Sequence, residues 1–239
     1  MKIKNLTKSE FKNYISEIKT IVLPVGAVEP HGDHLPLGTD IFIPEGLVNK
    51  FEEKIGDKIM IAPPVNYGHV WTMKPYPGAV NISTSILVEY LNEIGNSFLD
   101  NGIKNIVMLN GHGGNVSAIN TAAEKLADQG ARVIIFSWWQ DFKEEILEIC
   151  DTQGHAGEDE SSAVLAVAED YCHMELAKVN NNKLIATIKE KNIGKISYKN
   201  ALSGDPRQAS KEKGEKLLKK ISNKMIEIIT KFEDGDIRK

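Results

Sequence analysis

The sequence lacks the features that mark secreted, membrane-spanning or redox-active chains. It has only two cysteines, Cys150 and Cys172, which are too few for a disulfide framework and are not spaced as a C-x-x-C motif. No apolar run approaches the roughly 18 residues needed to cross a bilayer. The N-terminal stretch MKIKNLTKSEF also lacks the apolar segment of a signal peptide. We therefore expect a cytoplasmic protein with no membrane partner.

An excess of basic residues is also missing. The 29 lysines and arginines are outnumbered by 33 aspartates and glutamates, which gives a net charge of −4. A nucleic-acid-binding surface is normally basic, so we expect no nucleic-acid partner. The lysines near the C-terminus alternate with Glu212 and Glu215, which favours a helix face exposed to solvent over a binding patch.

What the sequence does contain is an ordinary globular composition, with 41% hydrophobic and 26% charged residues. Its 239 residues suit one large domain, which we place at 1–239. The alternation of short apolar runs with amphipathic stretches predicts an α/β fold whose mostly parallel sheet is covered by helices on both faces. The runs predict buried strands at 20–26, 59–65, 105–111 and 131–139, and the stretches predict helices at 42–56, 83–102, 115–130, 158–171 and 209–233.

A polar loop follows each of the four predicted strands. These loops read EPHGDH, NYGHVW, NGHGGN and WWQD. Because ligands bind beyond the carboxyl ends of the strands in such sheets, all four loops would meet at one edge. They carry His31, His34, His69 and His112, and His155 lies in a further glycine-rich loop. This convergence is the main reason, from the residues alone, to predict an enzyme.

The stretch EPHGDHLPLGTD, residues 29–40, has the side chains of a metal site. Its Glu-x-His spacing puts Glu29 and His31 on the same side of an extended segment, and Asp40 could return as a bridging carboxylate. Carboxylate and imidazole ligands together suit Zn²⁺, Mn²⁺ or Fe²⁺. Two such metals about 3.5–4 Å apart would hold a bridging hydroxide and polarise a carbonyl group. No serine or cysteine nucleophile signature competes, and NGHGGN lacks the glycine order of nucleotide-binding loops.

Four segments resemble the creatininase family of metal-dependent amidohydrolases. They are LPVGAVEPHGDHLPLGTD, LNGHGGN, HAGEDESS at 155–162 and SGDPRQASKEKGEKLL at 203–218, and they follow the family order from about residue 20 to 220. The resemblance implies a three-layer α/β/α sandwich and a homo-oligomer, often a hexamer. It also implies a dinuclear site that hydrolyses a non-peptide C–N bond in a small-molecule substrate, commonly a cyclic amide or formamide.

The resemblance further implies how the two divalent metal ions of each chain would be held. Glu29 and His112 look like ligands of one metal, and His31 looks like a ligand of the other. Asp40 looks like the bridge between them. The metals themselves could be Zn²⁺, Mn²⁺ or Fe²⁺, because sites of this donor type bind several divalent ions.

Creatininase has a glutamate two residues after the histidine of NGH, and this chain has Gly114 there. Glu160 in HAGEDE is the candidate replacement ligand. The family also suggests that His155 lies near the reacting centre, where His155 or Glu160 would move a proton to the leaving nitrogen. Simpler interpretations remain open. Glu160 could be a carboxylate in the first turn of a helix that the helix dipole stabilises, and His155 could cap that helix. His34 and Asp33 could support the ligands without binding metal.

Several substrates fit this arrangement. The glycine at 114 argues against creatinine itself. One alternative is a formamide hydrolase that acts on a pyrimidine intermediate of flavin or deazaflavin synthesis. Another is a peptidase that trims a modified precursor peptide. A metal-binding protein that kept the fold and lost catalysis is the alternative from a different class.

Two further features bear on the substrate. Trp138 and Trp139 end a predicted strand, so that one would pack in the core while the other faces the substrate. PYPGAV (75–80) resembles the Phe-Pro-Gly-Thr loop of the family, which often has a serine and a Glu-His pair just before it. At those positions this chain has Val70, Thr72 and Met73.

Overall fold

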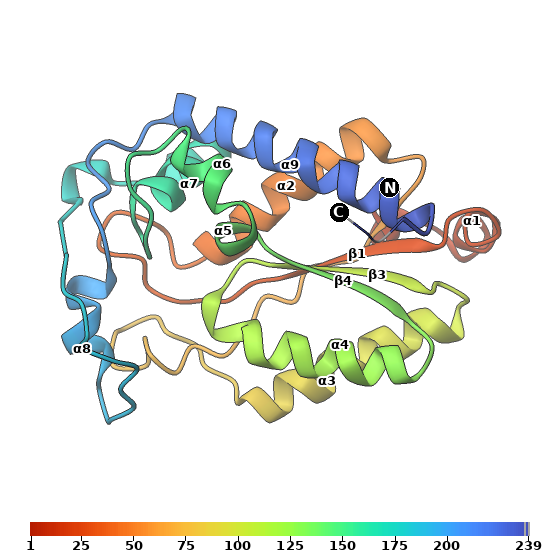
Figure 1. The fold of residues 1–239 in the computed structure, drawn as a ribbon, viewed down its shortest axis with the longest axis horizontal. Helices are drawn as coiled ribbons and strands as arrows, with labels where there is room; N and C mark the ends of the chain where they lie inside the picture. The colour runs from red at the N-terminus through yellow and green to blue at the C-terminus, as the bar shows by residue number, and fades with distance from the viewer. Residues whose placement is uncertain (237, 239) are drawn as a thin grey trace.

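The computed structural model contains a central sheet of four parallel strands in the order β2-β1-β3-β4 (Figure 1). β1 (Thr20–Val25) pairs with β2 (Met60–Ile61) on one side and with β3 (Asn105–Asn110) on the other. β3 in turn pairs with β4 (Arg132–Ser137). The structure describes residues 1–236 and 238. The predicted parallel sheet is confirmed.

Helices cover both faces of this sheet (Figure 1). α3 (Thr84–Asp100) packs against α4 (Val116–Asp128) on one face. α2 (Thr39–Ile55), α7 (Glu158–Ala168) and α9 (Lys211–Glu233) pack together on the other. The predicted three-layer α/β/α sandwich is therefore confirmed.

Each central strand contributes side chains to two hydrophobic cores, because successive side chains of a strand point to opposite faces of the sheet. In β1, Ile21 and Leu23 join the core under α3 and α4, whereas Val22 joins the core under α2, α7 and α9. Ile106 and Val107 of β3 divide in the same way. Burial on both faces explains why these runs are apolar at nearly every position and do not alternate with polar residues.

Several boundaries differ from the predicted ones, three of them near the site or in the sheet. The run 59–65 retains only the short strand β2, because Pro63 and Pro64 have no N–H to donate to a neighbouring strand. β4 ends at Ser137, and WWQD forms the short helix α5 (Trp138–Asp141) instead of a loop. α2 begins at Thr39, before the predicted start at residue 42, and this places Asp40 in its first turn.

Several short helices were not predicted. α1 (Lys8–Tyr14) begins with a capping box in which Thr7 and Glu10 bind each other's backbone N–H groups. The other short elements are α6 (Lys143–Leu147), α8 (Gly194–Ser197) and the 3₁₀ turns η1 (Ile3–Asn5), η2 (Gly113–Asn115), η3 (Glu169–Tyr171), η4 (Met174–Leu176) and η5 (Lys199–Ala201).

The lysine-rich segment near the C-terminus is the amphipathic helix α9. Leu217 and Ile221 are buried against the sheet layer, while Lys216 and Lys219 are exposed. The prediction of a solvent-facing helix is confirmed. Across residues 1–236 and 238, no helix combines the length and the apolarity needed to cross a membrane.

Candidate functional site

The five predicted metal ligands lie together beyond the carboxyl ends of β1 and β3. Glu29 and His31 follow β1, and His112 follows β3. Asp40 comes from the first turn of α2, and Glu160 comes from the first turn of α7. All five side chains are buried. The sequence therefore identified residues that the fold brings to one place.

Asp40 is shared by two groups of candidate ligands. Its Oδ2 lies 3.0 Å from Nδ1 of His112, and its Oδ1 lies 3.2 Å from Nε2 of His31. Glu29 completes the group with His112, and Glu160 completes the group with His31. Within each group one ligand atom per residue lies within 4.8 Å of the others. Such an arrangement can hold two cations on either side of one carboxylate.

Backbone carbonyls fix the orientation of both histidine rings. Nδ1 of His31 donates to the Glu29 carbonyl at 3.1 Å, and Nε2 of His112 donates to the His69 carbonyl at 3.0 Å. A carbonyl oxygen can only accept, so in the neutral rings the other nitrogens carry the lone pairs. Those nitrogens are the ones that face Asp40. Metal-binding histidines commonly have this support from a second hydrogen bond.

The electrostatics of the cluster favour a cation. Burial alone would lower the pKa of His31, but the nearby charges of Asp40 and Glu160 raise it to about 9. His31 Nε2 and Asp40 Oδ2 are also buried without a hydrogen-bond partner among the described residues. A divalent cation would satisfy both atoms and the surrounding negative charge. The residues present therefore fit a metal centre.

The carboxylate of Glu160 lies close to His31 and also accepts a hydrogen bond from a backbone N–H group. Its Oε2 lies 3.5 Å from Nε2 of His31 and accepts the N–H of Ala156 at 2.7 Å. Burial raises the pKa of Glu160 to about 8, since the opposing charge of His31 is outweighed by burial and by Asp159. Burial therefore disfavours the ionised form of Glu160 unless a cation balances its negative charge.

Gly114 has no room for a side chain. A Cβ atom there would lie 2.0 Å from the His69 carbonyl oxygen and 2.5 Å from Nε2 of His112. The glutamate that creatininase has at this position would therefore require the backbone to move. Within the present backbone, Glu160 is a carboxylate that does reach the second group of ligands.

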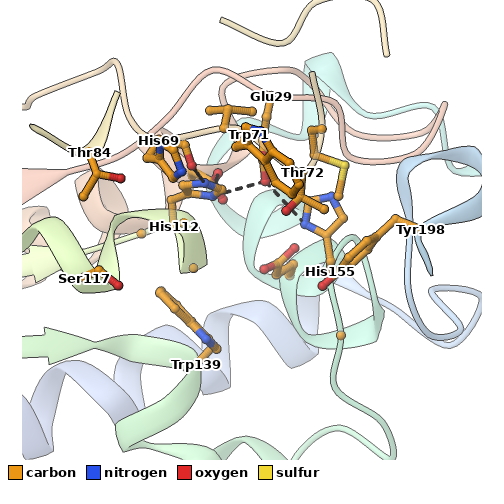
Figure 2. A pocket seen from close by; sticks show the side chains of 18 of the residues that line it. Glu29, His69, Trp71, Thr72, Thr84, His112, Ser117, Trp139, His155 and Tyr198 are labelled. Carbon is orange, nitrogen blue, oxygen red and sulfur yellow. Dashed lines mark hydrogen bonds and ion pairs between the residues drawn. The ribbon is translucent and has the colours of Figure 1, made fainter. Parts of the chain in front are cut away.

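His155 lies at the edge of the cluster and does not cap a helix. Its Nε2 donates to the Pro30 carbonyl at 3.1 Å, and its Nδ1 lies 3.6 Å from Oε1 of Glu29. Burial, with the charge of His31, lowers the pKa of His155 to about 4. The ring is therefore neutral at pH 7, and its Nδ1 can accept a proton. Figure 2 shows it between Glu29 and Tyr198.

The two residues expected to support the ligands behave differently. Nε2 of His34 is 3.0 Å from the hydroxyl of Ser161, beside Glu160 in α7. Asp33 instead forms an exposed ion pair with Lys178 at the surface. His34 therefore holds the first turn of α7, while Asp33 does not reach the ligands.

A cavity of about 660 Å³ opens onto the cluster. Trp139 lines it, whereas Trp138 is fully buried, so the predicted division of this pair is confirmed. Trp71 and Tyr198 also line it (Figure 2). Neither was predicted. Tyr198 comes from a segment without a recognisable motif, and only the fold brings it beside His155, with the ring centres 5.4 Å apart.

The comparisons with known proteins point to one family. The family model Creatininase, described as creatinine amidohydrolase, matches residues 4–229. A mycofactocin precursor peptide peptidase of Mycolicibacterium smegmatis is 30% identical over 225 residues, which cover 91% of this chain and 87% of that protein. A creatinine amidohydrolase of Pseudomonas putida is 26% identical over 175 residues, which cover 65% of this chain and 66% of that protein.

A solved structure described as "Creatininase Mn" has the same fold. It superimposes with a TM-score of 0.86 at 21% identity, and the match covers 97% of this chain and 98% of that one. The fold, the family match and the cluster of carboxylates and histidines lead to one conclusion. The chain belongs to the creatininase family of metal-dependent hydrolases.

Proposed function

We propose that this protein hydrolyses an amide C–N bond with two divalent metal ions. Glu29, Asp40 and His112 would hold one ion, and His31, Asp40 and Glu160 would hold the other. The observation that carries the proposal is Asp40, whose two oxygens face the histidines of two different groups. Glu160 takes the place of the glutamate that Gly114 excludes.

Bound in this way, two metal ions lower the pKa of a water molecule and polarise a carbonyl oxygen. The chain supplies the remaining functions. Asp40 sets the positions of both ligand groups. His155 accepts a proton at Nδ1 and delivers it to the leaving nitrogen, because Pro30 holds its other nitrogen and its lowered pKa keeps the ring neutral at pH 7. Trp139 and Tyr198 line the cavity and would contact a bound substrate.

One candidate substrate is a small cyclic amide or formamide. A cavity of about 660 Å³ has the size usual for small-molecule sites. Hydrolysis of a non-peptide C–N bond, which the resemblance implies, stays a prediction for this chain. The identity of the metal also stays open between Zn²⁺, Mn²⁺ and Fe²⁺, since nitrogen and oxygen ligands accept all three.

A modified precursor peptide is the second candidate substrate. A further cavity of about 330 Å³ is also lined by Thr72, Lys189 and Tyr198, so it lies next to the first. An extended substrate could occupy both. The relative that is 30% identical is named a precursor peptide peptidase, and this name supports a peptide substrate.

Metal content tests the proposal. We expect close to two divalent ions per chain in protein purified without chelator, and a loss of at least one in His31→Ala. His173→Ala is the matched control, because His173 is exposed and belongs to neither ligand group. One ion or none, unchanged in His31→Ala, would contradict a dinuclear site. The loaded protein is then assayed with cyclic amides, formamides and peptides. The homo-oligomer stays a prediction, which light scattering after gel filtration would test.

A further inference from the structure

The side chain of His69 belongs to none of the groups of candidate metal ligands. His69 lines the cavity beside Glu29 and His112 (Figure 2). It is half-buried and lies in the loop that follows β2. The mechanism proposed above does not use its side chain, although its carbonyl supports His112.

The structure fixes His69 at three of its polar groups. Its backbone N–H donates to Oδ1 of Asn115 at 2.9 Å, and its carbonyl accepts from His112 at 3.0 Å. Its Nδ1 donates to the Ile82 carbonyl at 3.0 Å. Because that carbonyl can only accept, the neutral ring has its lone pair on Nε2. His69, a residue of the cavity wall, therefore has a hydrogen-bond acceptor on a ring whose orientation is fixed.

The surroundings of His69 suit a polar part of a substrate. The side chains of Thr84 and Ser117, at the N-terminal ends of α3 and α4, line the same cavity. Figure 2 shows them with His69 on the side away from Tyr198. This wall therefore offers hydroxyl groups and an imidazole, and Tyr198 lies on the other side (Figure 2).

Two neighbours of His69 in its own loop, Val70 and Met73, cannot take this role. Val70 and Met73 are buried in a small cluster with Ala27 and Ala201. Both side chains are almost fully buried and apolar. The imidazole that this loop contributes to the cavity wall is therefore that of His69.

We propose that Nε2 of His69 accepts a hydrogen bond from a substrate N–H group adjacent to the scissile amide. The protein would then select substrates with a second amide N–H, such as a peptide backbone. A simple formamide has no such second group. This inference rests on the proposed function and narrows its substrate class to peptide-like amides.

An N-methyl scan tests the inference by binding. The probes are N-acetyl-tetraalanine amide and its analogues that each carry one N-methylated amide. They are titrated by calorimetry into two metal-loaded proteins. One carries His155→Ala, in which we expect turnover to be slow, and the other carries both His155→Ala and His69→Ala. We expect one analogue to bind roughly tenfold more weakly than the parent peptide when His69 is present. That difference should vanish in His69→Ala and persist in part in His69→Gln, whose side-chain oxygen can accept.

Two controls keep the outcomes distinct. His173→Ala should leave the N-methyl pattern unchanged, and thermal unfolding checks that His69→Ala keeps the fold. An N-methyl effect that is equal with and without His69 would overturn the inference, as would peptides that do not bind a chain that holds two metals. Metal content is measured on the same samples. A chain that binds no metal would contradict the proposed function, whereas a fully loaded chain without the His69 effect contradicts only the inference.

Discussion

Oδ1 of Asp40 lies 3.2 Å from Nε2 of His31. The other carboxylate oxygen faces His112 at 3.0 Å, so one buried side chain joins two groups of candidate ligands. A carboxylate can bridge two cations because each oxygen has free lone pairs and both share the negative charge. The first prediction concerns this residue.

Asp40→Asn should remove at least one metal ion per chain, because one end of the amide is a donor and the bridging charge is lost. Loss of a residue that only supports ligands costs about 10- to 100-fold in metal affinity or activity, so the loss at Asp40 should exceed 100-fold. Metal analysis and the rate of amide hydrolysis measure it. Asp33→Asn is the matched control, since this carboxylate lies in the loop that leads into α2 and its side chain is 56% exposed. Equal behaviour of the two variants would refute the bridging role.

Gly114 and Gly113 give a second, paired prediction. A Cβ at Gly114 would lie 2.0 Å from the His69 carbonyl, whereas the nearest atom to a Cβ at Gly113 is Cζ2 of Trp139 at 3.9 Å. Gly114→Ala should therefore lower the free energy of unfolding by about 2 kcal/mol or more and should reduce metal content by displacing His112. Gly113→Ala should be nearly neutral. Urea unfolding and metal analysis of both variants check this, and similar losses in both would count against the steric argument.

Much of the site could be predicted because its ligands lie close together in the sequence or follow buried strands. Glu29, His31 and Asp40 occupy one short stretch, and His112 follows an apolar run that ends in Asn-Gly. In a parallel sheet, such positions must meet at the carboxyl edge. Glu160 required the resemblance as well, since a first-turn carboxylate has an ordinary structural role.

The other features of the site depend on contacts between distant segments, which no local sequence pattern predicts. Tyr198 meets His155 only because the segment after α8 folds back over the cavity. Asp40 was expected in a loop but lies in α2, whose start is marked by no side-chain cap. Conversely, the Thr7 and Glu10 capping box was visible in the sequence and would have located α1.

The two adjacent tryptophans should respond differently to truncation. Trp138 is fully buried in the core, whereas Trp139 lines the cavity. Trp138→Ala should cost about 3–5 kcal/mol of unfolding free energy, because it leaves a large void. Trp139→Ala should cost clearly less and should instead raise KM for the substrate. Chemical unfolding and steady-state kinetics on both variants separate the effects, and a larger stability loss at Trp139 would contradict this assignment.

The last prediction concerns the dependence of stability on pH, at a site remote from the metal ligands. Glu145 is buried in α6 and accepts a hydrogen bond from Lys224 of α9. Burial alone would raise the pKa of Glu145, but this hydrogen bond, a backbone hydrogen bond and the charges of Lys224 and Lys220 together lower the pKa below its usual value. A group whose pKa is lower in the folded state stabilises the fold when ionised. Its contribution is complete above the unfolded pKa of about 4.3 and disappears as the pH falls through the lower folded value.

Glu145→Gln should therefore lower the unfolding free energy by about 1 kcal/mol at pH 7, and the difference from wild type should shrink towards zero near pH 3. Glu148→Gln is the matched control. Its partner is Lys220, but its side chain is 62% exposed, and an exposed pair contributes little because water screens both charges. Urea unfolding at pH 7, 5 and 3 measures both variants. A Glu145→Gln deficit that stays constant across this range would show that Glu145 stabilises α6 and α9 by packing and not through its charge.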